Sequence, residues 1–265
     1  MRLPPDVTDI TEHFLSLIDE SAPGLVTGLY LRGSLGFGEY FEGRSDVDFT
    51  AVLSARPGTS QLDALAAAHE AVHEKRPLPH FDGFHLVGAD LREPPDRCPD
   101  LPCMFEGAFR QAGRLDVNPV SWHELASQGI TIRGPRLTAA EVWTDSAALR
   151  AYSHGNLTSY WAAVVEQLRR RPTEAATPEA AAWCVLGVSR LHHVLATGSM
   201  TSKSAAGRYA LTAFKPRWQP IVREALRARE RPHESSVYDH DRGGRGRDTT
   251  AFTAMVIKAG LALGA

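Results

Sequence analysis

Short runs of strand-forming residues mark the first half of the chain. Residues 26–31, 45–53 and 81–87 are rich in valine, leucine, phenylalanine and tyrosine, and each run is bounded by a polar or glycine-containing stretch. Runs of this length and composition predict β-strands. A further strand is predicted in residues 129–135, where a Gly-Pro turn closes it. The first half is therefore expected to be built on a sheet.

Helical periodicity surrounds these strands. Apolar side chains recur on one side of residues 8–20, which predicts a packing helix with Thr8 or Asp9 as its cap. A Pro-Gly-Thr turn then leads into an alanine-rich helix over residues 59–76. Residues 92–102 contain four prolines and several charges, so an irregular loop is predicted there.

The second half of the chain has only the helical pattern. Helices are predicted over residues 147–171, 178–197, 202–214, 220–231 and 249–263. The segment 233–248 between the last two is rich in Asp, Gly and Arg and is predicted to be a loop. Its run Arg242–Arg247 could contact phosphate, but a solvated loop of balanced charge explains it as well.

The change of pattern near Asp145 predicts two domains, residues 1–146 and residues 147–265. The first is expected to contain a mixed sheet with helices, and the second to be an all-α helical bundle. The predicted fold class is therefore α+β.

Composition narrows the possible partners. The chain has 265 residues, 43% of them hydrophobic, and a formal net charge of -2, which gives no general attraction to nucleic acid or to membranes. A small-molecule substrate is therefore favoured. Cys98, Cys103 and Cys184 lack a zinc-binding spacing and cannot all pair, so they are interpreted as reduced thiols of a soluble, cytoplasmic protein. Oligomeric state is not predicted.

The candidate chemistry lies where the first two strands meet polar residues. The first strand runs into Gly33-Ser34, where exposed backbone amides suit an anion and Ser34 could cap a helical turn. Asp46 and Asp48 are two residues apart at the start of the second strand, so both carboxylates point to one face. Two acids on one face repel each other unless a cation lies between them. The alternative is that both simply cap a turn and face solvent.

A third acid on the next strand could join this pair. Asp82 shares a face with Phe84 and Leu86, whereas His85 lies on the opposite face. Asp82 is therefore chosen over His85 as a further metal ligand or as the group that accepts a proton from an attacking hydroxyl. His80 is a weaker candidate for the same role.

Two histidine pairs are candidate ligands by their spacing. His69 and His73 are four residues apart on a predicted helix but have no third ligand in view, so they are expected to be surface or boundary residues. His192 and His193 are expected to serve packing.

The Gly-Ser turn followed by Ser-Asp-x-Asp resembles the nucleotidyltransferase signature of the DNA polymerase beta superfamily. Residues 186–211 resemble the C-terminal helical domain of streptomycin/spectinomycin-type aminoglycoside adenylyltransferases, and the likeness extends to residues 130–135. The resemblance thus covers most of the chain. It implies a polymerase beta-like nucleotidyltransferase domain followed by a helical substrate-binding domain.

The resemblance also implies site roles. Gly33 and Ser34 match the Gly-Ser turn that binds phosphates, Asp46 and Asp48 match the Mg²⁺ ligands, and Asp82 matches the acidic residue on the next strand that serves as catalytic base. ATP is the implied co-substrate, and the implied acceptor is a hydroxyl of a small molecule. Basic residues of the second half are expected to reach the triphosphate; the candidates are Lys203, Arg217 and Arg223.

One departure concerns the acceptor. The family's drug-modifying members carry acidic residues in the segment that corresponds to residues 202–209, and here the matching positions are Ser204 and Arg208. A positive charge would oppose a cationic aminoglycoside by Coulomb repulsion, so the expected acceptor is less basic than streptomycin. Two alternatives stay open: a transferase that adenylylates a protein, and a non-catalytic nucleotide-binding module on the same fold.

Overall fold

The computed structural model describes residues 3–263, and the chain forms two compact units. The first unit ends at Asp145 and the second begins at Ser146. Each unit has its own hydrophobic core, so each is described by itself.

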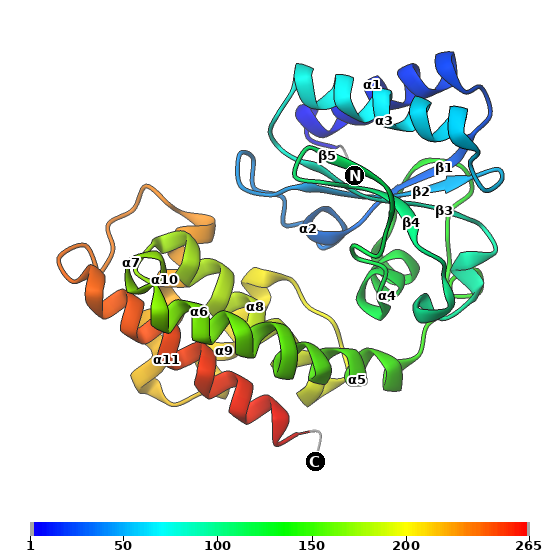
Figure 1. Ribbon diagram of the computed structural model, residues 1–265. Helices are drawn as coiled ribbons and strands as arrows, with labels where there is room; N and C mark the ends of the chain where they lie inside the picture. Colours follow the sequence, from blue (N-terminus) through cyan, green and yellow to red (C-terminus); the bar gives the residue numbers. More distant parts are fainter. Residues whose placement is uncertain (1–2, 264–265) are drawn as a thin grey trace. The chain divides into compact units, whose positions relative to one another are not determined.

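A six-stranded mixed sheet forms the centre of the first unit (Figure 1). Its strands are β1 (Val26–Leu31), β2 (Val47–Leu53), β3 (Phe81–Val87), β4 (Leu101–Phe105), β5 (Ala108–Gly113) and β6 (Ile130–Arg133). Their order is β5-β4-β3-β2-β1-β6. β2 and β3 pair in parallel, and the other neighbours pair antiparallel. The predicted strands are thus confirmed, and with them the α+β class.

Helices cover both faces of this sheet (Figure 1). α1 (Pro5–Ser21) and α3 (Thr59–Lys75) lie over one face, where Phe14 and Leu65 pack against the inward side chains of β1 and β2. α4 (Pro119–Gln128) lies over the other face, where Trp122 stacks on Phe84. The site residues described below come from the ends of strands between these two layers.

Three details of the first unit differ from the sequence prediction. The loop predicted over residues 92–102 contains two short 3₁₀ turns and the first residues of β4, and the β4–β5 hairpin was not predicted at all. α1 begins at Pro5, before the predicted caps, because proline suits the first turn of a helix. His69 is buried in the core rather than at the surface, and it contacts His85.

The second unit is helical, as predicted. Its longer elements are α5 (Ser146–Asn156), a π-helical turn (Leu157–Trp161), α6 (Ala162–Arg170), α8 (Pro178–Thr197), α9 (Lys203–Ala213), α10 (Gln219–Glu230) and α11 (Arg242–Leu261). α7 (Pro172–Ala175) is a single turn. The side chains of α8 form the centre of the core, together with apolar residues of α10 and α11. In the part of the chain that the structure describes, no helix has the length and apolar character needed to cross a bilayer.

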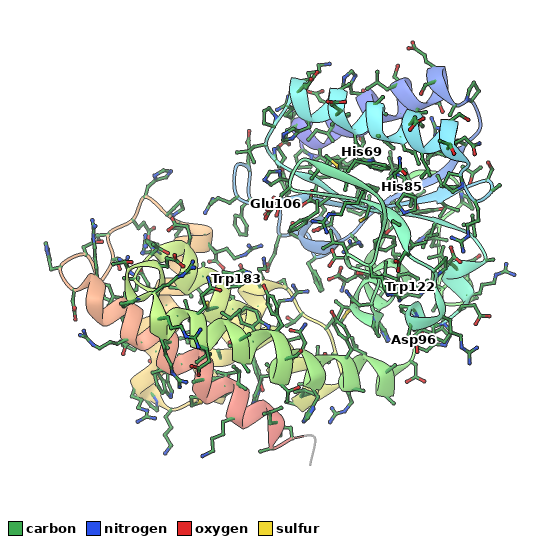
Figure 2. The ribbon with its side chains drawn as sticks, viewed as in Figure 1. His69, His85, Asp96, Glu106, Trp122 and Trp183 are labelled. Atoms are coloured by element: carbon green, nitrogen blue, oxygen red, sulfur yellow. The ribbon has the colours of Figure 1, made fainter. Side chains whose placement is uncertain are left out.

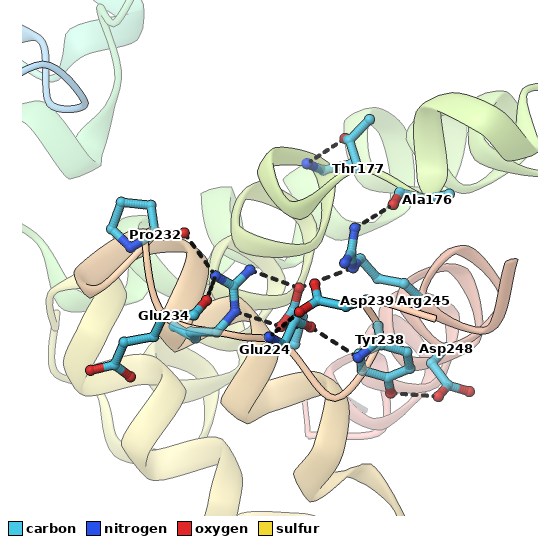
Figure 3. Close-up of polar contacts among 12 residues, drawn as sticks. Ala176, Thr177, Glu224, Pro232, Glu234, Tyr238, Asp239, Arg245 and Asp248 are labelled. Atoms are coloured by element: carbon cyan, nitrogen blue, oxygen red, sulfur yellow. Dashed lines mark hydrogen bonds and ion pairs between the residues drawn. The ribbon is translucent and has the colours of Figure 1, made fainter. Parts of the chain in front are cut away.

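The predicted loop over residues 233–248 is wrong in its second half, because α11 already begins at Arg242. Asp241 caps this helix by accepting a hydrogen bond from the N–H of Gly244 at 2.7 Å. Arg245 is buried and pairs with Glu224 at 3.0 Å, as Figure 3 shows. The glycines that suggested a loop allow close packing instead: a Cβ on Gly246 would come within 3.2 Å of the backbone of Ala176.

Candidate active site

The parallel pairing of β2 and β3 brings the predicted acids together. Asp48 lies directly opposite Asp82 in the register, so two carboxylates emerge next to each other on the face that carries α4. Asp46 precedes β2 and is exposed, whereas Asp82 is only 7% exposed. The prediction that Asp82 and His85 point to opposite faces is confirmed, because His85 contacts His69 on the α3 side.

The Gly-Ser turn packs directly against Asp48. Gly33 has a φ of 60°, in the left-handed region, and a Cβ at this position would lie 2.0 Å from Oδ2 of Asp48. Glycine is therefore required both by its backbone conformation and by the neighbouring carboxylate. Ser34 lies in the single helical turn α2 (Gly33–Gly36), and no side-chain hydrogen bond caps that turn, so the predicted capping role of Ser34 is wrong.

A buried arginine that the sequence analysis missed lies beside the acids. Arg32 is 4% exposed, and its Nη2 donates to Oδ2 of Asp116 at 2.9 Å, while its Nη1 lies 3.7 Å from Oε2 of Glu124. Its backbone N–H donates to the carbonyl of Asp48 at 2.9 Å. Asp116 has a φ of 55°, which fits a residue held in place by a specific contact. Arg32 thus pairs with two carboxylates that follow β5, Asp116 and Glu124, and its backbone is hydrogen-bonded to that of Asp48.

Carboxylates outnumber cations around Asp48. Burial raises the pKa of Asp48 to about 7; the positive charge of Arg32 opposes this rise, and the negative charges of Asp116, Glu124 and Asp46 add to it. Net repulsion of this kind is relieved by a bound cation.

Asp82 has a different environment. Burial raises the pKa of Asp82 to about 6, although the N–H of Glu106 donates to its Oδ1 at 2.9 Å and lowers the pKa. The charge of Asp46 raises this pKa and that of His80 lowers it. A carboxylate with a pKa near neutrality suits a group that accepts a proton during a reaction.

The donor set fits magnesium bound together with phosphates. Carboxylate oxygens are ligands that Mg²⁺ prefers, and it is usually held by one or two carboxylates plus the phosphates of a substrate. Among residues 3–263, no three His, Cys, Asp or Glu side chains cluster closely enough to hold an ion by themselves. Asp46, Asp48 and Asp82 as ligands of the ion stay a prediction.

The three predicted phosphate-binding cations lie on different elements of the second unit. Lys203 is the first residue of α9, and Arg217 lies in a short 3₁₀ turn, Pro216–Trp218. Arg217 is exposed and its guanidinium stacks on Trp218 at 4.6 Å. Arg223 is exposed on α10. Contact of these three residues with the triphosphate stays a prediction.

The structure shows the surroundings of Ser204 and Arg208, the two positions that differ from the acidic pattern expected for drug-modifying relatives. Ser204 is buried, and Arg208 forms an ion pair with Glu230 of α10 at 2.8 Å. The positive charge of Arg208 is therefore balanced within the second unit, so the repulsion expected from the sequence is weaker than that of a free arginine. His192 serves packing as predicted, because its ring contacts Tyr209 and Phe214.

Comparison with known proteins gives two likenesses. Residues 156–243 match the family model described as "Aminoglycoside adenylyltransferase, C-terminal domain". The structure is similar to that of spectinomycin adenyltransferase AAD(9) from Enterococcus faecialis, solved with ATP and spectinomycin; the TM-score is 0.63 and the identity 14%, over 93% of this chain and 99% of that chain. Comparison with curated protein sequences gives no match.

The structural match and the family match support different parts of the prediction. At this identity the structural match establishes the fold of both units, a mixed-sheet domain followed by helices. The family match lies within the second unit and includes residues 186–211, which carried the predicted resemblance. The resemblance to aminoglycoside nucleotidyltransferases is therefore confirmed.

Proposed function

We propose that this chain, which resembles the aminoglycoside nucleotidyltransferases in its helical unit and in its fold, is a magnesium-dependent adenylyltransferase. It moves AMP from ATP to a hydroxyl of a small, aminoglycoside-like molecule. The observation that carries this proposal is the juxtaposition of Gly33 with Asp48, and of Asp48 with Asp82 across the parallel strands. In this proposal Gly33 belongs to the phosphate-binding turn, Asp48 binds the metal, and Asp82, with a pKa of about 6, is the base.

The roles of the residues follow from their surroundings. Asp46 and Asp48 would hold Mg²⁺, which supplies charge neutralisation of the triphosphate when bound. The backbone amides after Gly33 are placed to donate to phosphate oxygens. Asp82 accepts the proton as the acceptor O–H bond breaks, while the oxygen bonds to the α-phosphorus and pyrophosphate leaves. The acceptor proton thus passes to Asp82, AMP passes to the acceptor oxygen, and pyrophosphate is the leaving group.

The acceptor is inferred from the helical unit. AAD(9) was solved with spectinomycin, and in this chain the ion pair with Glu230 balances the positive charge of Arg208. A modestly cationic, hydroxyl-rich aminoglycoside is therefore the proposed acceptor class. Lys203, Arg217 and Arg223 remain predictions for ATP contact, and a rise in the KM for ATP after each Lys→Met or Arg→Met exchange tests them separately.

A cytoplasmic location is part of the same proposal. Cys98, Cys103 and Cys184 are all free thiols in the structure, and all are buried. Unpaired cysteines suit a reducing compartment, where ATP is also available.

The proposal is tested by incubating the purified protein with Mg²⁺, each NTP in turn and a panel of aminoglycosides including spectinomycin and streptomycin. Mass spectrometry should show one added nucleoside monophosphate on a panel member with ATP, and none with the Asp82→Asn variant. Label found on protein instead would favour protein adenylylation. No adduct on any panel member would reject the aminoglycoside assignment.

A further inference from the structure

The β4–β5 hairpin ends in a turn that reaches toward Asp82. Phe105 pairs with Ala108, so the loop consists of Glu106 and Gly107 alone, and their φ angles are 47° and 80°. Positive φ at both loop residues is typical of a type I′ turn, the tight turn that suits the twist of a hairpin. Glu106 is labelled in Figure 2.

The backbone of this turn holds one oxygen of Asp82. The N–H of Glu106 donates to Oδ1 of Asp82 at 2.9 Å. In a two-residue hairpin loop, the N–H of the first loop residue takes no part in the strand ladder, so it is free to bind a side chain. Asp82 is buried, and a hydrogen bond from a fixed backbone donor restricts the rotation of its carboxylate. Oδ2 then remains the oxygen that can receive a proton.

A histidine of α3 packs under the turn. A Cβ on Gly107 would lie 2.6 Å from Cε1 of His73, so the imidazole occupies the space beside this glycine. The ring of His73 in turn lies parallel to that of His80, with centroids 6.4 Å apart and an angle of 15°. His80 directly precedes the strand that carries Asp82. The turn is thus packed against His73, whose ring is adjacent to that of His80.

We infer that the Glu106-Gly107 turn, supported by His73, is a positioning element for Asp82. The inference rests on the proposed function, because it assigns Asp82 as the base of the transfer. It adds that the base is oriented by a backbone amide from a separate hairpin. Gly107 and His73 therefore influence the reaction without contacting the substrate. The side chain of Glu106 is dispensable for this role, since its backbone N–H makes the contact.

The first test does not depend on activity. Amide hydrogen exchange measured by NMR should show that the Glu106 N–H of the wild-type protein is protected. Asp82→Ala should abolish this protection, because the acceptor is gone. Rapid exchange of the Glu106 amide in the wild-type protein would overturn the inference, whatever the protein's enzymatic activity.

The second test separates positioning from folding. Gly107→Ala should lower kcat about ten- to hundredfold, the effect of losing a charge-assisted hydrogen bond, and leave the KM for ATP within about twofold. Adding His73→Ala should restore most of the kcat, since it removes the atoms that the new Cβ meets. Gly24→Ala is the matched control: Gly24 also has a positive φ, 73°, but no atom lies within 4 Å of its added Cβ. It should keep the wild-type kcat.

The outcomes distinguish the two claims. Loss of Glu106 protection in Gly107→Ala with an unchanged kcat would overturn the positioning role and leave the proposed function intact. A kcat loss of equal size in Gly24→Ala would overturn it too, because general strain would then explain the effect. A wild-type protein with a protected Glu106 amide but no nucleotidyl transfer would refute the proposed function, and the positioning role with it.

Discussion

Two arginines, one in each unit, are buried to the same degree and have opposite surroundings. Arg32 and Arg245 are each 4% exposed. The single guanidinium of Arg32 faces Asp116 and Glu124, and Asp46 and Asp48 are further acids in the same region. The pKa of Asp48 is raised to about 7. The acids around Arg32 are therefore only partly neutralised by this arginine.

Around Arg245 the balance is reversed. Glu224 receives both Arg245 at 3.0 Å and Arg227 at 2.8 Å, and Ser236 donates to the same carboxylate (Figure 3). Burial raises the pKa of Glu224, but the hydrogen bonds from Arg227 and Ser236 outweigh it, so the pKa falls below its ordinary value. This network is complete by itself and links α10, α11 and the loop between them. We call the Glu224 network balanced, because its carboxylate is fully paired, and the network around Arg32 unbalanced, because its acids outnumber the cation.

The largest expected effect is on catalysis at the unbalanced network. Asp48→Asn should reduce Mg²⁺-dependent pyrophosphate release by at least about a thousandfold, because an amide is a poor Mg²⁺ ligand. The melting temperature should not fall, since the neutral side chain removes repulsion with Asp46, Asp116 and Glu124. A pyrophosphate assay and thermal unfolding measure the two effects. Full activity of this variant would reject the metal-pair assignment.

At the balanced network the expected effect is on stability instead. Glu224→Gln leaves Arg245 and Arg227 without their common counter-ion, which should lower the free energy of unfolding by about 3–5 kcal/mol. The matched exchange Asp116→Asn, at a carboxylate that is 42% exposed, should cost about 1 kcal/mol or less. Urea unfolding compares the two variants. Equal losses would show that the networks do not differ as described.

The first unit also contains a buried histidine pair, His69 and His85. His69 and His85 lie 3.1 Å apart between Nε2 atoms; burial lowers the pKa of His85 to about 4 and that of His69 well below its ordinary value. Both are neutral in the folded state, whereas the unfolded chain takes up protons below about pH 6.5. Their contribution to stability is therefore present above that pH and is lost as the pH falls toward 4, by about 3 kcal/mol for His85 alone.

A double exchange isolates this contribution. Asp48 and Asp82 have raised pKa values, so they change stability in the opposite direction over the same pH range. Asp48 and Asp82 are both retained in the His69→Leu, His85→Leu double variant. The difference in the free energy of unfolding between this variant and the wild type therefore reports only the two histidines. The wild-type protein should lose stability relative to the variant between pH 6.5 and pH 4. A difference that is independent of pH would contradict burial of the neutral pair.

The smallest expected effect lies at the exposed ion pair of the second unit. Arg208 is more than half exposed, so Arg208→Ala should change the free energy of unfolding by less than about 1 kcal/mol. Because the exchange leaves Glu230 without its arginine, this carboxylate can pair with a cationic acceptor. The KM for a cationic aminoglycoside should therefore fall about two- to fivefold. Steady-state kinetics with spectinomycin and streptomycin compare acceptors of different charge. A rise in KM would show that Arg208 itself contacts the acceptor.

Local patterns predicted much of the fold and part of the site. The strand that carries Asp82 was predicted with its bounds, whereas the one that carries Asp48 begins at Val47, two residues after the predicted start at Ser45. The helix over residues 178–197 was predicted to the residue, since Pro178 suits its first turn and Gly198 ends it in the left-handed region. The Gly-Ser turn and the acid pair Asp46 and Asp48 were predicted as site residues because the spacing of these residues along the sequence is characteristic.

The rest depended on contacts that are distant in the sequence. Arg32 lies 84 residues from Asp116, so no local pattern could reveal the pair. The β4–β5 hairpin was missed because Glu-Gly is a weaker turn signal than Asn-Gly and prolines precede it. The glycine-rich start of α11 was misinterpreted as a loop, because its stability comes from the burial of Arg245 and not from helix propensity.

Metal binding tests the central claim most directly, namely that the excess of acid around Asp48 is a cation site. Mg²⁺ can be titrated calorimetrically into protein saturated with a non-hydrolysable ATP analogue, using the wild type, Asp48→Asn and Glu224→Gln. The wild type and Glu224→Gln should bind Mg²⁺ alike, and Asp48→Asn should bind it at least about tenfold more weakly. Equal Mg²⁺ affinity in the wild type and Asp48→Asn would contradict the account.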